Sequence, residues 1–367
     1  MKFKVEQKDL ARHITIAQRG ISTRSTLQIL DGILIQANDN GLKLTATDLE
    51  ISIETFIEAS VEEKGKIVLN SRIGDIVKKL PDDTISFHVK DNHVHIKCQN
   101  AEFNIIGNSG EDYPDLPIIM EENQFTISKD LLKSAIRQTV FATTQDETRP
   151  SLTGVLLEIS NKEISFVSLD GYRLALRKMP TQSDIDEKII IPGRSLNELN
   201  KILEDKEEDL TISISQGQVI FNLGDTIMYS KLLEGQFFNY KDIMRSDHKT
   251  KVVVNRRSLQ NGLERASLLA KEEKANLVKI SVTNGELIIK SNSEMGDVYE
   301  EINSYQDGDD LNIAFNSRYI LEGIKIMDNE EIVMNFVGSL NPCIINGVDD
   351  DTYTYLVLPV RLAQDDF

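Results

Sequence analysis

The sequence contains no tryptophan and only two cysteines, Cys98 and Cys343, which are far apart and form no CxxC pair. This excludes a disulfide framework and indicates a reduced, cytoplasmic protein. No stretch approaches the ~20 uninterrupted apolar residues of a membrane span, and the first residues lack the apolar run of a signal peptide. We therefore expect a cytoplasmic globular protein.

Motifs for phosphate binding or nucleophilic catalysis are also missing, including GxxxxGK[ST], GxSxG and GxGxxG. His93 and His95 form the one metal-like pair, but they lie in an alternating segment without a cysteine or carboxylate cluster. A surface strand explains them better. The sequence predicts no catalytic residue, no metal site and no cofactor, and so a protein that is not an enzyme.

Positive charge is in deficit overall. With 41 basic and 59 acidic residues the net charge is −18, which by itself argues against a nucleic-acid binder, because such proteins usually present a basic surface. Net charge does not describe how the charges are distributed, however. Their positions along the chain have to be considered.

One pattern occurs three times along the chain. A strand, a polar turn and an amphipathic helix follow one another at 3–19, 125–141 and 252–271. The leucines that open these helices are Leu10, Leu131 and Leu259, at offsets of 121 and 128 residues. Self-similarity at a fixed period is the mark of a repeat architecture.

A second strand–helix pattern recurs inside each repeat. Its arginines, Arg72, Arg194 and Arg318, are 122 and 124 residues apart. Residues that commonly begin helices precede them, namely Asn70, Pro192 and Asn316. Six strand–helix half-units are therefore predicted.

Between the helices, apolar and polar residues alternate at 42–57, 164–179 and 287–302, which predicts antiparallel hairpins. The fold class is therefore α+β, with two helices on antiparallel sheets in each repeat. We place the three domains at 1–122, 123–246 and 247–367. On the repeat alone, three similar domains that stack as an interaction scaffold remain an alternative.

Positive charge is concentrated on the six predicted helices, at 8–19, 71–80, 129–141, 194–204, 255–271 and 316–326. Together they carry a net charge of +10, which leaves −28 for the rest of the chain. Basic residues seven apart, such as Arg72 and Lys79, share one helical stripe, and apolar residues such as Leu10, Ile14 and Ala17 share another. One basic stripe would be an ordinary solvated face, but six indicate a shared polyanion bound through phosphates. Few aromatic residues accompany the charges, which favours duplex over single strands.

The sequence resembles the bacterial DNA polymerase III beta subunit family, the sliding clamps, over its whole length. The most specific motifs are EDYPDLP at 111–117, SLDGYRLA at 168–175 and LVLPVRL at 356–362. The resemblance implies three DNA-clamp domains and a head-to-tail homodimer whose six domains form a ring around duplex DNA. Helices would line the hole and sheets would form the outer wall. A monomeric adaptor built from the same domains is the competing interpretation.

The resemblance also implies a processivity factor without catalytic activity, which tethers the replicative polymerase and is loaded by another protein that hydrolyses ATP. Its partners would insert short peptides into a pocket between the second and third domains. Matching pocket positions are Leu152, Asp170, Gly171, Tyr172, Arg173, Leu174, Asn316, Tyr319, Leu340, Pro342, Val357, Leu358, Pro359, Val360 and Arg361. Matching positions at the dimer seam are Phe103, Leu268 and Leu269.

The candidate DNA-binding residues combine helix cations with two loop arginines, Arg24 and Arg149, that match family DNA contacts. The helix cations are Arg72, Lys79, Lys133, Arg137, Arg194, Lys201, Arg257, Arg265, Arg318 and Lys325. Reversing the charge of Arg72 and Arg194 is expected to weaken DNA association and to flatten its dependence on salt.

Three features depart from the family pattern. Phe238 stands where many clamps have proline and Asp242 where some have arginine, so we expect a differently shaped wall of the pocket. The tail 363–367 extends past the usual family end and reads Gln-Asp-Asp-Phe after Ala363, similar to the glutamine-plus-aromatic peptides that clamps bind. We hypothesise that this tail lies near the pocket or competes for it.

Overall fold

The computed structural model describes residues 1–22, 27–116, 123–204, 208–215, 217–244, 247–270 and 276–361. Each of the six α-helices in these ranges follows a strand at once or after two residues, as predicted. The six units are β1 (Lys2–Glu6) with α1 (Gln7–Ala17), β6 (Gly65–Asn70) with α2 (Ile73–Val77), β11 (Asn123–Ser128) with α3 (Lys129–Thr139), β15 (Glu187–Pro192) with α4 (Gly193–Ile202), β19 (Thr250–Asn255) with α5 (Arg256–Ala270), and β23 (Leu311–Asn316) with α6 (Ser317–Lys325).

The predicted alignment of the first set of helices was wrong by one residue in the second repeat. The fourth residues of α1, α3 and α5 are Leu10, Leu132 and Leu259, and all three are fully buried. Leu131, which the sequence pattern aligns with Leu10 and Leu259, is 39% exposed. Equivalent positions in the three helices are therefore given by their buried residues and not by the first leucine of each helix.

The predicted helix at 71–80 is also shorter than expected. Arg72 is the N-cap of α2 and Lys78 its C-cap, so Lys79 lies beyond the helix. Gly74 inside the segment and Pro81 just after it both disfavour a longer helix. Arg72 and Lys79 therefore flank a five-residue helix instead of sharing a helical stripe.

The three predicted hairpins are confirmed. They are β3 (Gly41–Thr47) with β4 (Ile51–Ile57), β13 (Glu163–Leu169) with β14 (Arg173–Pro180), and β21 (Glu286–Ser293) with β22 (Gly296–Gly308). The turns that lead into β13 and β21, at Asn161-Lys162 and Asn284-Gly285, have positive φ at both residues. Two-residue hairpin loops favour this geometry because its twist matches that of the strands.

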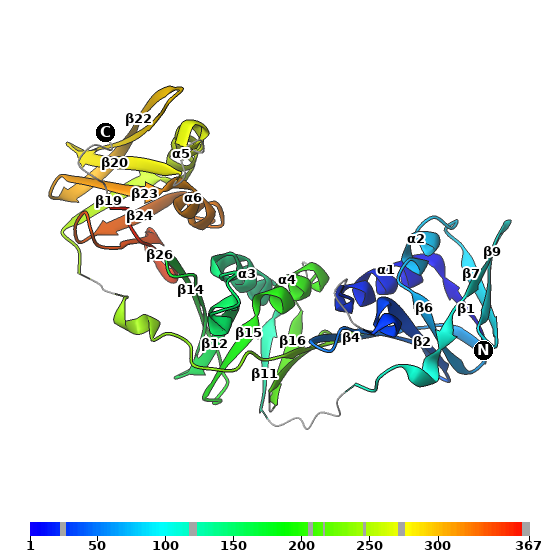
Figure 1. Cartoon of the computed structure of the whole chain (residues 1–367). Coiled ribbons are helices and arrows are strands. Elements are labelled where there is room, and N and C mark those ends of the chain that lie inside the picture. Colours follow the sequence, from blue (N-terminus) through cyan, green and yellow to red (C-terminus); the bar gives the residue numbers. More distant parts are fainter. Residues whose placement is uncertain are drawn as a thin grey trace. The chain divides into compact units, whose positions relative to one another are not determined.

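One compact unit comprises Met1–Leu132 and Arg194–Leu232. Its five-stranded sheet has the order β5 (Ser60–Glu63), β1, β7 (Thr84–Lys90), β8 (His93–Cys98) and β9 (Ala101–Ile106). Its nine-stranded sheet runs β10 (Asn108–Ser109), β6, β2 (Gly32–Asn38), β3, β4, β18 (Thr226–Lys231), β17 (Gln218–Asn222), β16 (Asp209–Ser215) and β11. Leu10 and Ile14 of α1 and Val77 of α2 share a buried core with residues of both sheets (Figure 1).

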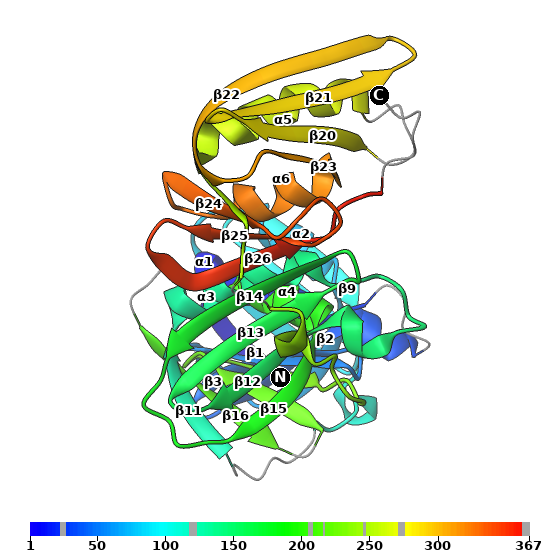
Figure 2. The same ribbon diagram turned by 90° about the vertical axis from the view of Figure 1, so that its left-hand side faces the viewer.

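The other compact unit comprises Lys133–Gly193 and Leu233–Phe367. One continuous sheet has the order β15, β12 (Gly154–Ser160), β13, β14, β26 (Asp350–Val357), β25 (Cys343–Gly347), β24 (Glu331–Phe336), β19, β22, β21, β20 (Leu277–Thr283) and β23. Figure 2 shows β26 beside β14, with which it pairs antiparallel. α5 and α6 pack on this sheet through fully buried residues such as Leu263 and Ile324.

The strands of the second repeat are shared between the two units. β11, β16, β17 and β18 join the nine-stranded sheet, whereas β12 to β15 join the other. The boundaries near 122 and 247 therefore remain a prediction. Among the described helices, none has the length and apolar character needed to cross a membrane.

Candidate functional site

Three of the predicted DNA-binding cations are exposed and have no ion-pair partner in the described parts of the chain. Arg72 and Lys79 flank α2, and Arg257 lies in the first turn of α5. Since their charges are not neutralised locally, they are the cations most available to phosphate. Lys133 is half-buried on α3, and Arg24 lies outside the described residues.

The other exposed cations of the set form ion pairs at the surface. Surface pairs contribute about 0–1 kcal/mol, so a phosphate can replace the carboxylate at little cost. The pairs, with N–O distances, are Arg137–Asp328 (3.1 Å), Arg149–Asp146 (3.1 Å), Lys201–Glu198 (2.7 Å), Arg265–Glu300 (2.6 Å), Arg318–Glu322 (2.6 Å) and Lys325–Glu264 (2.9 Å).

Arg194 has a structural contact that the sequence did not reveal. Its guanidinium lies 2.5 Å from the carboxylate of Asp48, whose side chain is only 4% exposed. The other oxygen of Asp48 accepts hydrogen bonds from the backbone N–H groups of Glu50 and Ile51 in the β3–β4 turn. Charge reversal at Arg194 would disturb this turn, so the double variant with Arg72 does not isolate DNA binding.

Most residues of the predicted peptide pocket come from the β13–β14 turn with the start of β14, and from the end of β26 with the segment after it. The carboxylate of Asp170 accepts hydrogen bonds from the backbone N–H groups of Tyr172 (2.9 Å) and Arg173 (3.1 Å). Gly171 has φ of +95°, a conformation that glycine adopts without steric strain. The turn leaves the ring of Tyr172 58% exposed and stacked on Tyr319, with ring centroids 5.7 Å apart.

Arg173 is buried, and its donors are used within the chain. Its guanidinium donates to Asp170, to Glu322 and to the carbonyl of Phe141, and it lies over the rings of Phe141 and Tyr319. Burial alone would raise the pKa of Glu322, but hydrogen bonds from Arg318 and Arg173 lower it. Arg173 therefore holds the turn and α6 together, a role that positions the candidate site.

Backbone hydrogen bonds join the segment after β26 to the β13–β14 turn and to β23. The N–H of Leu358 donates to the carbonyl of Tyr172 (2.8 Å), and that of Val360 donates to Ala314 (2.8 Å). Leu358 is 37% exposed, Pro359 is half-buried and Arg361 is exposed.

The remaining predicted positions differ in role. Asn316 caps α6 by accepting from the N–H of Arg318, and Val357 is fully buried in the core with α5 and α6. Leu340 is 67% exposed and Pro342 half-buried. The hypothesis for the tail 363–367 falls outside the described residues.

An apolar cluster adjoins the predicted site. Leu174 is buried in it and Leu152 packs against it. Sequence reasoning missed Tyr240, Ile243 and Met244, which belong to the same cluster, and named only Phe238 and Asp242 of this segment. Those two residues are exposed, Phe238 to 50%. The repeat could have revealed this packing. In the first repeat Tyr113 packs on Leu34 and Val68, and in the second repeat Tyr240 packs on Leu156 and Ile190. Equivalent residues of the two clusters are 122 or 127 positions apart in the sequence.

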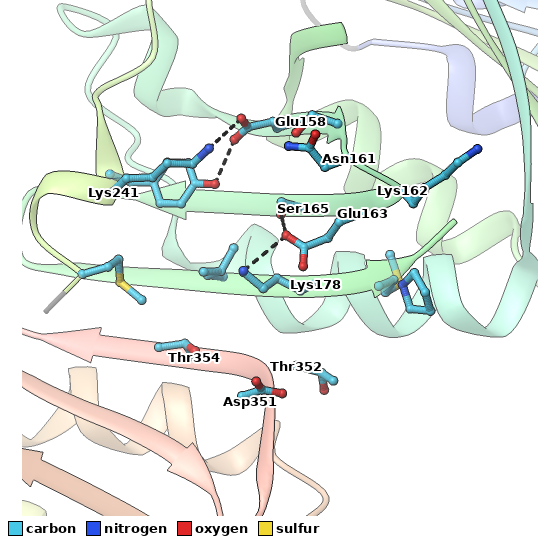
Figure 3. A pocket seen from close by; sticks show the side chains of 16 residues that line it. Glu158, Asn161, Lys162, Glu163, Ser165, Lys178, Lys241, Asp351, Thr352 and Thr354 are labelled. Carbon is cyan, nitrogen blue, oxygen red and sulfur yellow. Dashed lines mark hydrogen bonds and ion pairs between the residues drawn. The ribbon is translucent and has the colours of Figure 1, made fainter. Parts of the chain in front are cut away.

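A cavity of about 820 Å³ continues from this cluster along β12, β13, β14 and β26. Figure 3 shows Glu158 at its edge, where Lys241 and Tyr240 donate to the carboxylate at 2.9 and 2.8 Å. Burial alone would raise the pKa of Glu158, but hydrogen bonds from Lys241, Tyr240 and Lys188 outweigh it and lower the pKa to about 2.

The depressed pKa of Glu158 predicts a pH-dependent contribution to stability. Its ionised form is favoured in the folded state, so the contribution is present above pH 4.5, the ordinary value, and is lost as pH falls toward 2. In urea unfolding, the deficit of Glu158→Gln should be largest near neutral pH and should shrink below about pH 4. Glu163→Gln, which removes a 44% exposed partner of Lys178, is the control. A deficit that stays constant with pH would contradict the prediction.

The predicted seam residues lie on two surfaces. Phe103 is half-buried on β9, the outer strand of the five-stranded sheet, and packs against the core beneath. On α5, Leu268 is 67% exposed and Leu269 is half-buried. His93 and His95 share one face of β8, and no group of metal-ligating side chains is found among the described residues.

Comparison with known proteins places these features in one family. Models of the N-terminal, central and C-terminal domains of the DNA polymerase III beta subunit match residues 1–117, 126–239 and 241–361. The chain belongs to the DNA polymerase III beta subunit family. It therefore consists of three clamp domains and, like other members of this non-catalytic family, is not an enzyme.

Relatives in the family match over nearly the whole chain. The beta sliding clamps of Bacillus subtilis and Halalkalibacterium halodurans are 39% and 36% identical, covering 98% of this chain and 100% of each relative. The crystal structure of the DNA polymerase sliding clamp from Bacillus subtilis superposes with a TM-score of 0.96 at 38% identity, covering 99% of this chain and 100% of that one. The sliding clamp of Pseudomonas aeruginosa bound to griselimycin has a TM-score of 0.94 at 26% identity, with 99% and 100% coverage.

Proposed function

We propose that the chain is a sliding clamp, a homodimeric ring that encircles duplex DNA and tethers the replicative polymerase and other DNA-processing proteins. The observation that carries the proposal is the set of exposed cations on and beside the helices of a chain whose net charge is −18. Arg72, Lys79 and Arg257 are the clearest members. Contacts of this kind bind phosphates without reading sequence.

The distribution of charge suits a protein that moves along DNA. Cations that contact only phosphates keep the same energy at every base pair, so the protein can slide. The acidic remainder of the chain repels duplex elsewhere, which leaves the basic surface as the favourable path.

Two unpaired strand edges support a head-to-tail seam. β9 pairs only with β8 in the described sheet. Residues 296–303 of β22 pair with β21 on one side, while β19 pairs only with residues 304–308. An exposed edge readily accepts a strand from another chain. If β9 of one copy adds to β22 of the next, a contact between different surfaces repeats, and two such contacts close a ring.

The β13–β14 turn and the segment after β26 are proposed to receive the peptides of partner proteins. The exposed side chains of Tyr172 and Leu358 and the half-buried ring of Tyr319 lie beside polar groups that are already fixed by internal hydrogen bonds. Such a surface offers apolar contact and orientation at low entropic cost.

The test is retention on nicked circular DNA. A ring loaded on a closed circle should stay bound through gel filtration and be lost when the circle is linearised. Leu268→Lys, which places a charge on the proposed seam, should yield monomers by light scattering and lose retention on the circle. Equal loss of the unmodified protein from circles and linear DNA would overturn the ring and favour a monomeric adaptor.

A further inference from the structure

The β3–β4 turn repeats the geometry of the β13–β14 turn. Asp48 accepts hydrogen bonds from the backbone N–H groups of Glu50 (3.0 Å) and Ile51 (2.8 Å). Asp170 accepts from residues at the same spacing, Tyr172 and Arg173, at 2.9 and 3.1 Å. The two turns are 122 residues apart and share one backbone frame.

The strand beside each turn repeats as well. The N–H of Lys231, at the end of β18, donates to Glu50 at 2.9 Å, as that of Leu358 donates to Tyr172 at 2.8 Å. Two residues further on, Leu233 donates to Ile190 at 2.9 Å, as Val360 donates to Ala314 at 2.8 Å. The backbone arrangement at the proposed peptide site therefore has a counterpart where β4 pairs with β18.

A cavity of about 260 Å³ lies at this counterpart. Leu49, Pro114, Leu116 and the Tyr229 side chain provide apolar walls. At the floor the hydroxyl groups of Thr47 and Ser52 are hydrogen-bonded to each other at 2.6 Å, so they need no partner from a ligand. The volume is below the ~300–1,000 Å³ of pockets for whole small molecules, and it suits a single large side chain.

Leu49 at the mouth of the cavity is in an unfavourable conformation. Its φ is +76°, and its counterpart in the other turn is Gly171. For a residue with a Cβ, the left-handed form is less stable than the right-handed form. The side chain is 47% exposed, so its burial does not offset this cost. Strained residues of this kind cluster at ligand-binding sites.

The rim of the cavity differs in charge from the proposed peptide site. Glu50 and Lys231 form an ion pair at 3.3 Å, and Asp115 is exposed beside them. The positions equivalent to Glu50 and Lys231 are Tyr172 and Leu358, which are uncharged. Two carboxylates against one ammonium favour a ligand with a positive charge next to its apolar group.

We propose that this cavity is a second peptide-docking site. It takes a short extended peptide of a partner protein that inserts one leucine or aromatic side chain and places a lysine or arginine beside Glu50 and Asp115. The inference rests on the proposed function, in which the clamp is a docking platform. With different rim charges, the two sites select different peptides, so one chain can hold two partners at once.

The test uses blocked heptapeptides of serine and glycine with a central leucine, phenylalanine or tyrosine flanked by lysine. Titrated into the full-length chain, they should shift the methyl NMR signals of Leu49 and Leu116. Peptides flanked by glutamate should bind about tenfold or more weakly, a difference of about 1.4 kcal/mol. No shift of these signals at millimolar peptide would overturn the second site.

Two variants separate docking from folding. Leu49→Gly removes the apolar wall while it relieves the positive φ, so binding should fall while thermal stability is kept. Tyr172→Ala, at the other site, should leave these shifts unchanged. Shifts of the Leu116 methyl signals that persist in Leu49→Gly, or shifts that occur only at Leu358, would refute the second site and leave the clamp function standing. Loss of retention on circular DNA would refute the clamp function whatever the peptides do.

Discussion

Reversing the charges of Arg72, Lys79 and Arg257 together is expected to weaken binding to duplex DNA at least about tenfold and to flatten its dependence on salt. The three side chains are exposed and have no ion-pair partner among the described residues, so their replacement by glutamate breaks no internal contact of that kind. Each lost phosphate contact lowers the slope of log K against log salt by about 0.9. With two copies in a ring, the slope should fall by up to about 5. Fluorescence anisotropy at several salt concentrations gives both quantities.

The matched control reverses three exposed lysines that lie away from the helices, Lys64, Lys90 and Lys249. It makes the same change in net charge, so it separates a local contact from general repulsion. If both triple variants lose the same affinity with the same change of slope, the helix cations have no special role. An unchanged slope in the first variant would show that these cations do not face phosphate.

The largest effect on stability is expected from Arg173→Ala. The substitution leaves Glu322 without its buried partner, removes the anchor of Asp170 and vacates the space between the rings of Phe141 and Tyr319. Breaking a buried ion pair by removing one partner costs about 3–5 kcal/mol, and the partial exposure of Glu322 places this case near the lower figure. The melting temperature should fall by roughly 6–12 °C.

Arg318→Ala provides the comparison, since Arg318 also pairs with Glu322 but is 69% exposed. Its loss should lower the melting temperature by no more than about 2–4 °C, the effect of a surface pair. Peptide binding should be weakened in Arg173→Ala because the turn that contains Asp170 loosens. Arg173→Lys should restore binding only in part, since lysine lacks the planar guanidinium group that donates to several acceptors at once. Equal melting temperatures for the two alanine variants would refute the assignment of Arg173 as a positioning residue.

The repeat, the strand–helix units and the hairpins could be predicted from sequence because each rests on local periodicity. The ion-pair partners of the charged residues could not be predicted in this way. Arg194 is predicted to contact DNA, and the structure adds its ion pair with Asp48, which is 146 residues away in the chain. Arg173 is predicted to line the peptide pocket, and its partner Glu322 lies 149 residues away. Counting the charges along a helix gives the sign of its net charge. It does not show which of these charges form ion pairs with residues far away in the sequence.

Local breakers also shifted what periodicity predicted. The stripe expected of Arg72 and Lys79 needed a ten-residue helix, and Gly74 with Pro81 reduces it to five residues. The packing of Tyr240 is visible only by aligning it with Tyr113, although Tyr113 directly follows a short helical turn (Gly110–Asp112) and Tyr240 begins one (Tyr240–Asp242). Such features become predictable when the repeat is used as a template for contacts as well as for elements.

The strand pairings β4–β18 and β14–β26 have a mechanical consequence. Each one joins strands from two successive family-model matches by backbone hydrogen bonds, in addition to the covalent chain. The seam proposed between two copies would have no covalent link to support it. A protein that opens the proposed ring would therefore separate the β9 edge, while the internal strand pairings stay intact. Amide hydrogen exchange would report this as rapid deuterium uptake along β9 in the monomer and slow uptake along β18 and β26 in both monomer and dimer.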